Sequence, residues 1–190
     1  MPVTNAYELF LHEVGDIYDA EHRFLEGQQE MVQNATDEEL RGAIQEHIQQ
    51  TRQHVVNLER VFEELGEERR RETCEASQGL VNEAQKGVAE AGNGTVRDCV
   101  IVAAVAKAEH YEIAGYRNLI TGAQLMGHTG VERILTENLQ QEEETARIAE
   151  GSAEKLLRKA MQEEGGQEEG ERSEEEKGLI DKAKDRLTGQ

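Results

Sequence analysis

Two carboxylates interrupt an apolar stripe in the segment VAAVAKAEHYEIAGYRNLI, residues 102–120. Glu109 and Glu112 are three residues apart, so on a helix they share one face with the apolar side chains around them. A carboxylate that moves from water into a bundle interior loses several kcal/mol of solvation unless a cation compensates it. The spacing therefore predicts a buried acidic site that binds cations.

Polar residues interrupt the apolar stripes of the other predicted long helices at matching depths. These are Glu21 in the first helix, His47, Thr51 and His54 in the second, and Glu142 in the last. In one layer, the carboxylates would raise one another's pKa, and Lys107 and the two histidines are the few basic groups near them. Two metal ions bridged by carboxylates would neutralise the layer, and oxygen with imidazole donors suits iron or manganese.

The candidate metal ligands are therefore Glu21, His47, His54, Glu109, Glu112 and Glu142. Alternatives stay open, because these groups could instead form hydrogen-bonded core pairs without a metal, and Glu143 could face inward in place of Glu142. Thr51 is expected to be a packing hydroxyl, since neutral hydroxyls are weak metal donors. Tyr18 and Tyr116 are expected mainly to fill the core, with hydrogen bonding to a ligand carboxylate as the alternative.

Other ionisable residues are expected outside the site. Asp19 and His22 have the spacing of two ligands to one metal, but their angle relative to Glu21 directs them toward solvent or a partner. Glu83 is expected to be solvated. The remaining histidines, which are expected at the surface or in an interface, are His12, His110 and His128.

Apolar residues at alternating steps of three and four predict the helices that position these groups. Long helices are expected over residues 4–33, 36–66, about 95–126 and about 131–153, with a shorter one over about 73–91. Thr36 and Glu39 have capping-box spacing, Gly66 ends the second helix, and Thr95 and Asp98 are candidate caps of the third long helix. The order predicts an all-α four-helix bundle, with the extra short helix in the crossover between the second and third long helices.

Composition narrows the classes of partner. The net charge of −19 would repel nucleic-acid phosphates and anionic lipids, and no apolar run of membrane-spanning length is present. The start MPVTNAYELF lacks the pattern of a signal peptide, so the cytoplasm is expected. Cys74 and Cys99 are expected to be reduced. The acidic excess would also suit a high-salt cytoplasm, an interpretation that equal stability without salt would contradict.

The composition changes near residue 162. Residues 1–161 are predicted to form the bundle, whereas residues 162–190 are rich in Glu, Gly and Lys and poor in apolar side chains. Such a segment buries too little surface to offset its ordering entropy. A disordered or loosely helical acidic tail is therefore expected.

Four segments together resemble the helices of the YciE/YciF family, a stress-associated branch of the ferritin-like superfamily. They are EVGDIYDAEHRFL, HIQQTRQHVVNLE, VRDCVIVAAVAKAEHYEIAGYRNLI and LTENLQQEEETARIA, and the likeness covers roughly residues 5–155. The resemblance implies an antiparallel ferritin-like bundle, commonly a homodimer, with a rubrerythrin-like two-metal site. Within that site it matches Glu21, Glu109 and Glu112 to ligands of the superfamily.

The chain departs from the superfamily pattern on two helices. The usual Glu-x-x-His of the second helix is Thr51-x-x-His54 here, and Glu142 on the fourth helix is followed three residues later by Thr145 in place of His. Two expected donors are therefore missing. His47, one turn before Thr51, is a candidate replacement for the lost Glu.

Two functions of different classes follow from these patterns. The first is a stress-associated ferritin-like protein whose iron or manganese ions react with oxygen or peroxide. The second is a non-catalytic helical dimer that acts as a structural or partner-binding protein, with the polar layer fixing helix register. Iron storage would need a shell of many subunits, which a dimer does not provide. The sequence leaves open whether any reaction is catalysed.

Overall fold

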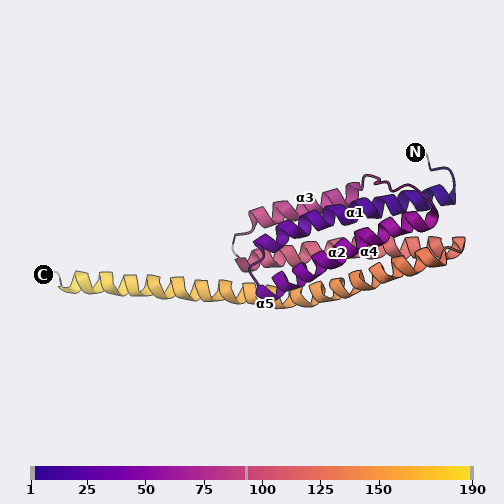
Figure 1. Ribbon diagram of the computed structural model, residues 1–190. Helices are drawn as coiled ribbons and strands as arrows, with labels where there is room; N and C mark the ends of the chain where they lie inside the picture. Colours follow the sequence, from indigo (N-terminus) through magenta and orange to yellow (C-terminus); the bar gives the residue numbers. More distant parts are fainter. Residues whose placement is uncertain (1–2, 93, 189–190) are drawn as a thin grey trace.

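A computed structural model describes residues 3–92 and 94–188, and it is helical from end to end apart from short connections. The helices are α1 (Ala6–Asn34), α2 (Glu38–Leu65), α3 (Glu75–Glu90), α4 (Gly94–Met126) and α5 (Thr129–Thr188). The four long helices form a bundle in which α1 and α5 each pack against both α2 and α4 (Figure 1). The predicted all-α bundle with an additional helix in the crossover is confirmed.

Helix direction follows from the length of the connections. Short turns join α1 to α2 and α4 to α5, so the two helices of each pair run in opposite directions (Figure 1). Between α2 and α4 the chain returns along the outside of the bundle, where α3 packs against α1 and α4. Neighbouring long helices are consequently antiparallel all round the bundle.

The buried apolar side chains divide into two main clusters along the bundle axis. One contains Phe10, Leu58, Tyr116 and Leu135, and the other contains residues nearer the start of α2, such as Ile44. Along every long helix the predicted site residues lie between the segments that supply these clusters. The polar layer therefore lies between two clusters of apolar side chains.

The residues that cap the helices differ from the sequence prediction at two positions. The predicted capping box of Thr36 and Glu39 is wrong: Asp37 is the N-cap of α2, and its carboxylate accepts from the backbone N–H groups of Glu39 and Leu40. Asp98 does not cap its own helix. It is fully buried and accepts from Thr36 N, Thr36 Oγ1 and Asp37 N, so it ties α4 to the turn between α1 and α2.

Two glycines have a definite structural role. Gly66 ends α2 in the left-handed region at φ 70°, as the sequence predicts. Gly122 on α4 faces α1, where an added Cβ would lie 2.8 Å from Phe10 Cδ2. The missing side chain at residue 122 allows the close approach of these two helices.

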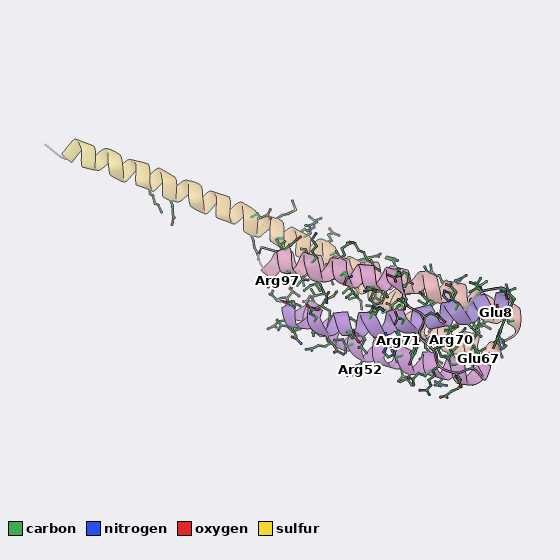
Figure 2. All side chains as sticks on the ribbon, turned by 90° about the horizontal axis from the view of Figure 1, so that it is seen from above. Glu8, Arg52, Glu67, Arg70, Arg71 and Arg97 are labelled. Carbon is green, nitrogen blue, oxygen red and sulfur yellow. The ribbon has the colours of Figure 1, made fainter. Side chains whose placement is uncertain are left out.

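Helix α5 continues through the predicted boundary at residue 162 and extends away from the bundle (Figures 1 and 2). The buried apolar side chains on α5 reach Ala160, and Thr95 Oγ1 donates a hydrogen bond of 3.0 Å to Glu163 just beyond it. After Gly166 the structure describes only the side chains of Glu174 and Lys177, both exposed. The division into bundle and tail stays a prediction, and the predicted tail's last two residues lie outside the described part.

None of the described helices combines the length and the apolar character that crossing a bilayer requires. The view from above labels charged side chains along the bundle, among them Arg52 on α2, Arg70 and Arg71 between α2 and α3, and Arg97 on α4 (Figure 2).

Asp98→Asn is predicted to destabilise the fold by about 1–3 kcal/mol, because the amide can no longer accept all three hydrogen bonds at the start of α2. Urea unfolding followed by circular dichroism measures the difference. The control is Glu90→Gln at an exposed carboxylate on α3. An Asp98→Asn variant with the stability of this control would contradict the role given to Asp98.

Candidate metal centre

Six ionisable side chains from all four long helices meet inside the bundle. None is more than 4% exposed, and they are Glu21 on α1, His47 and His54 on α2, Glu109 and Glu112 on α4, and Glu142 on α5. Each lies on its helix at the position where the apolar stripe predicts an inward side chain. The structure therefore brings together all six residues that the sequence singles out.

The first group of this layer contains Glu21, His54 and Glu142. His54 Nδ1 lies 2.8 Å from Glu142 Oε1 and 3.4 Å from Glu21 Oε1. One donor atom from each of the three residues lies within 4.8 Å of the others. These three donors are close enough to share one metal ion.

The second group contains His47, Glu109 and Glu142. His47 Nε2 lies 3.0 Å from Glu109 Oε1 and 3.8 Å from Glu142 Oε2. Their donor atoms also lie within 4.8 Å of one another. Glu142 belongs to both groups and offers one carboxylate oxygen to each, which is the geometry of a carboxylate that bridges two cations.

The two imidazoles are oriented in the same way. Gln141 Oε1 accepts from His54 Nε2 at 2.8 Å, and Gln50 Oε1 accepts from His47 Nδ1 at 3.1 Å. With the outer nitrogen protonated for these bonds, a neutral ring presents the lone pair of its inner nitrogen to the carboxylates. A hydrogen bond from the outer nitrogen is the usual way in which proteins orient a metal-ligating histidine.

Several buried polar atoms of the layer have no hydrogen-bond partner. They are Glu21 Oε2, His47 Nε2, His54 Nδ1, Glu109 Oε2, Glu112 Oε1 and both oxygens of Glu142. The ring nitrogens approach carboxylates closely but without the direction of a hydrogen bond. Native structures seldom leave so many buried atoms unpaired, and a bound ion is one of the recognised ways in which such atoms are satisfied.

Charge inside the layer is unevenly compensated. Burial, reinforced by the charges of Glu142 and Glu21, holds the pKa of Glu112 well above its usual range. Burial and Glu142 raise the pKa of Glu109 to about 8, although His47 opposes the shift. Glu112 is in neither three-residue group. Its buried Oε1 has no hydrogen-bond partner, and the charges that shift its pKa most are the negative ones of Glu142, Glu21 and Glu109, so it lacks the compensation that a cation would give.

Histidines compensate the other carboxylates. Burial alone would lower the pKa of His54, but the charge of Glu21 and contact with Glu142 raise it to about 11. Burial is likewise outweighed at His47, whose pKa Glu109 and Glu142 raise to about 9. Burial would raise the pKa of Glu142, yet contact with His54 keeps it below the ordinary value.

Further residues support the layer. Tyr116 fills the core, as predicted, and its hydroxyl also donates a short hydrogen bond to Glu21 Oε1, which is the alternative left open by the sequence. Asn138 Nδ2 donates to the same hydroxyl at 2.9 Å. Sequence reasoning missed Asn138, although its position four residues before Glu142 places it on the same inward face. It also missed Gln141 and Gln50, whose surface-like residue type gives no signal.

The positions of the side chains decide between the alternatives that the sequence left open for Glu143 and Thr51. Glu143 is 44% exposed and pairs with Arg117, so Glu142 is the inward carboxylate. Thr51 is a packing hydroxyl, accepting from Gln28 Nε2 at 3.1 Å and donating to the His47 carbonyl.

His47 lies beside one of the two departures from the superfamily pattern. Thr145 Oγ1 is 3.2 Å from His47 Nδ1, so the imidazole from α2 reaches the position on α5 at which the expected histidine is absent. The sequence suggested His47 as a replacement for the Glu missing at Thr51. Its contact with Thr145 also places it beside the position of the other lost donor.

Some expectations about neighbouring residues are wrong. Asp19 is only 4% exposed, because it accepts from Arg23, Arg71 and the backbone N–H of Cys74. Lys107 does not reach the layer and pairs with Glu83 at the surface.

The other minor expectations agree with the structure. Glu83 is exposed, both cysteines are free, and His110 is exposed.

Comparison with known proteins agrees with the fold and the residue pattern. The family described as "Domain of unknown function (DUF892)" matches residues 5–162. Protein YciF of Escherichia coli (strain K12) is 31% identical over 146 residues, which is 76% of this chain and 88% of YciF.

Two solved structures are similar over nearly their whole length. The E. coli stress protein YciF has a TM-score of 0.79 and 28% identity, with 83% of this chain and 99% of that chain covered. YcfI of Rhodopseudomonas palustris, for which a structural role has been suggested, has a TM-score of 0.77 and 34% identity, with 78% and 94% covered.

The metal-free protein is predicted to lose stability as the pH rises from about 6.5 to 9. Folding raises the pKa of Glu109 from 4.5 to about 8 and that of His47 from 6.5 to about 9. The folded state therefore retains protons that the unfolded chain has released, and this stabilisation disappears as the pH passes the folded pKa values. We expect the Tm to fall by roughly 5 °C or more.

Thermal unfolding in the presence of a chelator, at constant ionic strength, measures this dependence. Glu109→Gln removes one of the two titrating groups and should flatten the profile between pH 6.5 and 8. A Tm of the metal-free protein that stays constant or rises over the window would contradict the prediction.

Proposed function

The chain belongs to the DUF892 family and is a homologue of YciF, and from that premise we propose that it is a ferritin-like stress protein with a two-metal site. The proposed ligands are the six residues of the buried layer, and the proposed ions are iron or manganese. The proposal includes a homodimer in the cytoplasm. Membership of the family supports the fold and the stress association, and the layer's chemistry supports the metals.

One observation carries the proposal. Seven buried nitrogen and oxygen atoms of six carboxylate and imidazole side chains lack hydrogen-bond partners, and five of these six side chains form the two three-residue groups. Carboxylate oxygens with imidazole nitrogens form a donor set that suits iron and manganese. A cation in each group would use these atoms and would remove the repulsion between the carboxylates.

Each residue has a distinct proposed part. Glu142 would bridge both ions, while Glu21 with His54 and Glu109 with His47 would each complete one side. Glu112, whose buried Oε1 has no hydrogen-bond partner, would supply a further carboxylate to the loaded site. The Tyr116 hydroxyl would orient Glu21 and could return a proton to this end of the site.

Bound ferrous ions would supply the electrons that convert oxygen or peroxide and protons into water. The chain's own contribution is the enclosure of this chemistry. Apolar clusters lie at both ends of the buried layer, and Gln50 on α2 and Gln141 on α5 accept from the outer nitrogens of the two imidazoles. A buried reactive centre of this kind would reduce the oxidant inside the bundle, away from other molecules in solution.

A structural or partner-binding dimer is the second candidate function. The pairing of each histidine with a carboxylate favours it, because charged imidazoles would partly neutralise the layer without any metal. In that case the layer would only fix the register of the four helices. Metal content separates the two functions.

Protein purified without chelator is predicted to contain about two iron or manganese ions per chain. Glu142→Gln should lose most of both, because the shared carboxylate contacts both groups, whereas Glu21→Gln should lose about one. The exposed neighbour in Glu143→Gln provides the matched control and should keep the full content.

Elemental analysis together with anomalous scattering reads out these contents. A wild-type protein without metal, or a Glu142→Gln variant that retains it, would remove the metal proposal and leave the structural dimer. The molecular mass of the assembly in solution is a separate test, since a shell of many subunits would favour iron storage.

Anaerobic protein loaded with iron(II) is predicted to reduce about one hydrogen peroxide molecule for each pair of ferrous ions. The two electrons from the iron and two protons break the O–O bond and yield two water molecules. A peroxide assay with a ferric optical readout measures the ratio. Glu142→Gln should react no faster than free iron, and equal rates for wild type and this variant would exclude reaction at the centre.

A further inference from the structure

A cavity of about 180 Å³ lies among α2, α4 and α5 beside the polar layer. Its walls are largely aliphatic and include Leu40, Ile44, Val102, Val105 and Ala149. Val105 is four residues before Glu109, and Ile44 is three residues before His47, so the cavity follows the same inward helix faces as the site. The metal layer and the cavity are therefore neighbours along the bundle.

Small side chains on α5 leave this space open. Thr145, Ala149 and Ser152 line the cavity at steps of four and three residues, which places them on one face of the helix. The corresponding positions nearer the start of α5, such as Leu135, fill the core with large side chains. The cavity is consequently a local departure from the close packing of the bundle.

One end of the cavity contains a buried polar group. His47 is 4% exposed and lines the cavity together with Gln50 and Thr145, both of which contact its Nδ1 atom. Its other ring nitrogen lies among Glu109 and Glu142. A molecule in the cavity would therefore be separated from the carboxylates by this imidazole.

Exposed acidic residues also line the cavity. Glu46 and Glu144 are exposed, and Ile148, 41% exposed, adds an apolar side chain. Carboxylates that line a cavity repel anions, and an aliphatic wall gives a charged group no compensation. The lining selects against carboxylates and phosphates.

We propose that this cavity binds a small, uncharged, mainly aliphatic molecule that carries one hydrogen-bonding group, with that group at the His47 end. An engineered cavity of about 150 Å³ holds benzene, so the volume suits a chain of about six to eight carbons. The hydroxyl of an alcohol or a hydroperoxide can donate to Gln50 or Thr145. That such a molecule is a substrate of the metal centre rests on the proposed function, whereas its binding does not.

The probe is 1-hexanol, titrated into metal-free and metal-loaded protein and followed by isothermal calorimetry and by chemical-shift changes of Val and Ile methyl groups. We expect saturable binding with a Kd of about 1 mM or tighter. Hexanoate, of the same length but charged, should bind about tenfold more weakly. Equal binding of hexanoate would overturn the assignment of an uncharged ligand.

Filling the cavity tests its location. Ala149→Leu places a larger side chain on the inner wall, and Ala43→Leu does so at a half-buried position where overpacking is milder. Each should weaken hexanol binding by more than about tenfold. The matched control is Ala76→Leu on the exposed side of α3, which should bind as the wild type does. Unchanged affinity in folded Ala43→Leu would overturn the proposal.

Metal content distinguishes this proposal from the proposed function. Saturable hexanol binding in a protein that takes up no metal would support the cavity and reject the metal centre. Full metal content without hexanol binding would support the metal centre and reject the cavity proposal. Binding at the cavity together with slower peroxide reduction by the loaded protein would support both.

Discussion

The buried carboxylates repel one another, and the folded structure depends on the positive charge that offsets this repulsion. Glu21, Glu109, Glu112 and Glu142 come from three different helices, so each helix brings negative charge to the same interior layer. Two histidines from α2 oppose only part of this charge. The bundle can keep the layer because two apolar clusters hold the four helices together on either side of it.

Enclosure gives the layer its chemical character. The same carboxylates at a surface would be solvated, and their donor atoms would be satisfied by water. Inside the bundle they retain unpaired atoms, and the two histidines each keep one nitrogen aimed inward because glutamines engage the other. Fold stability and affinity for cations are therefore linked, since any cation that binds the folded layer stabilises the folded state.

The helical periodicity was enough to predict the bundle, the crossover helix and the burial of all six polar residues, because an inward position depends on local spacing. Side-chain partners depend on neighbouring helices and could not be predicted in this way. Asp19 illustrates the difference, since its burial depends on Arg71 and on the backbone of Cys74, far along the chain. The cap at Asp98 failed as a local prediction for the same reason: its partners are Thr36 and Asp37, in the turn between α1 and α2.

The lost superfamily donors and the cavity are connected through one residue. A histidine at residue 145 would extend from α5 toward the layer, whereas Thr145 leaves room for His47 to reach it from α2. The same short side chain, with Ala149 and Ser152 further along α5, leaves the space that becomes the cavity. Moving the imidazole from one helix to another thus preserves a nitrogen donor beside Glu109 and Glu142. It also opens the interior to a ligand at the point where that imidazole lies.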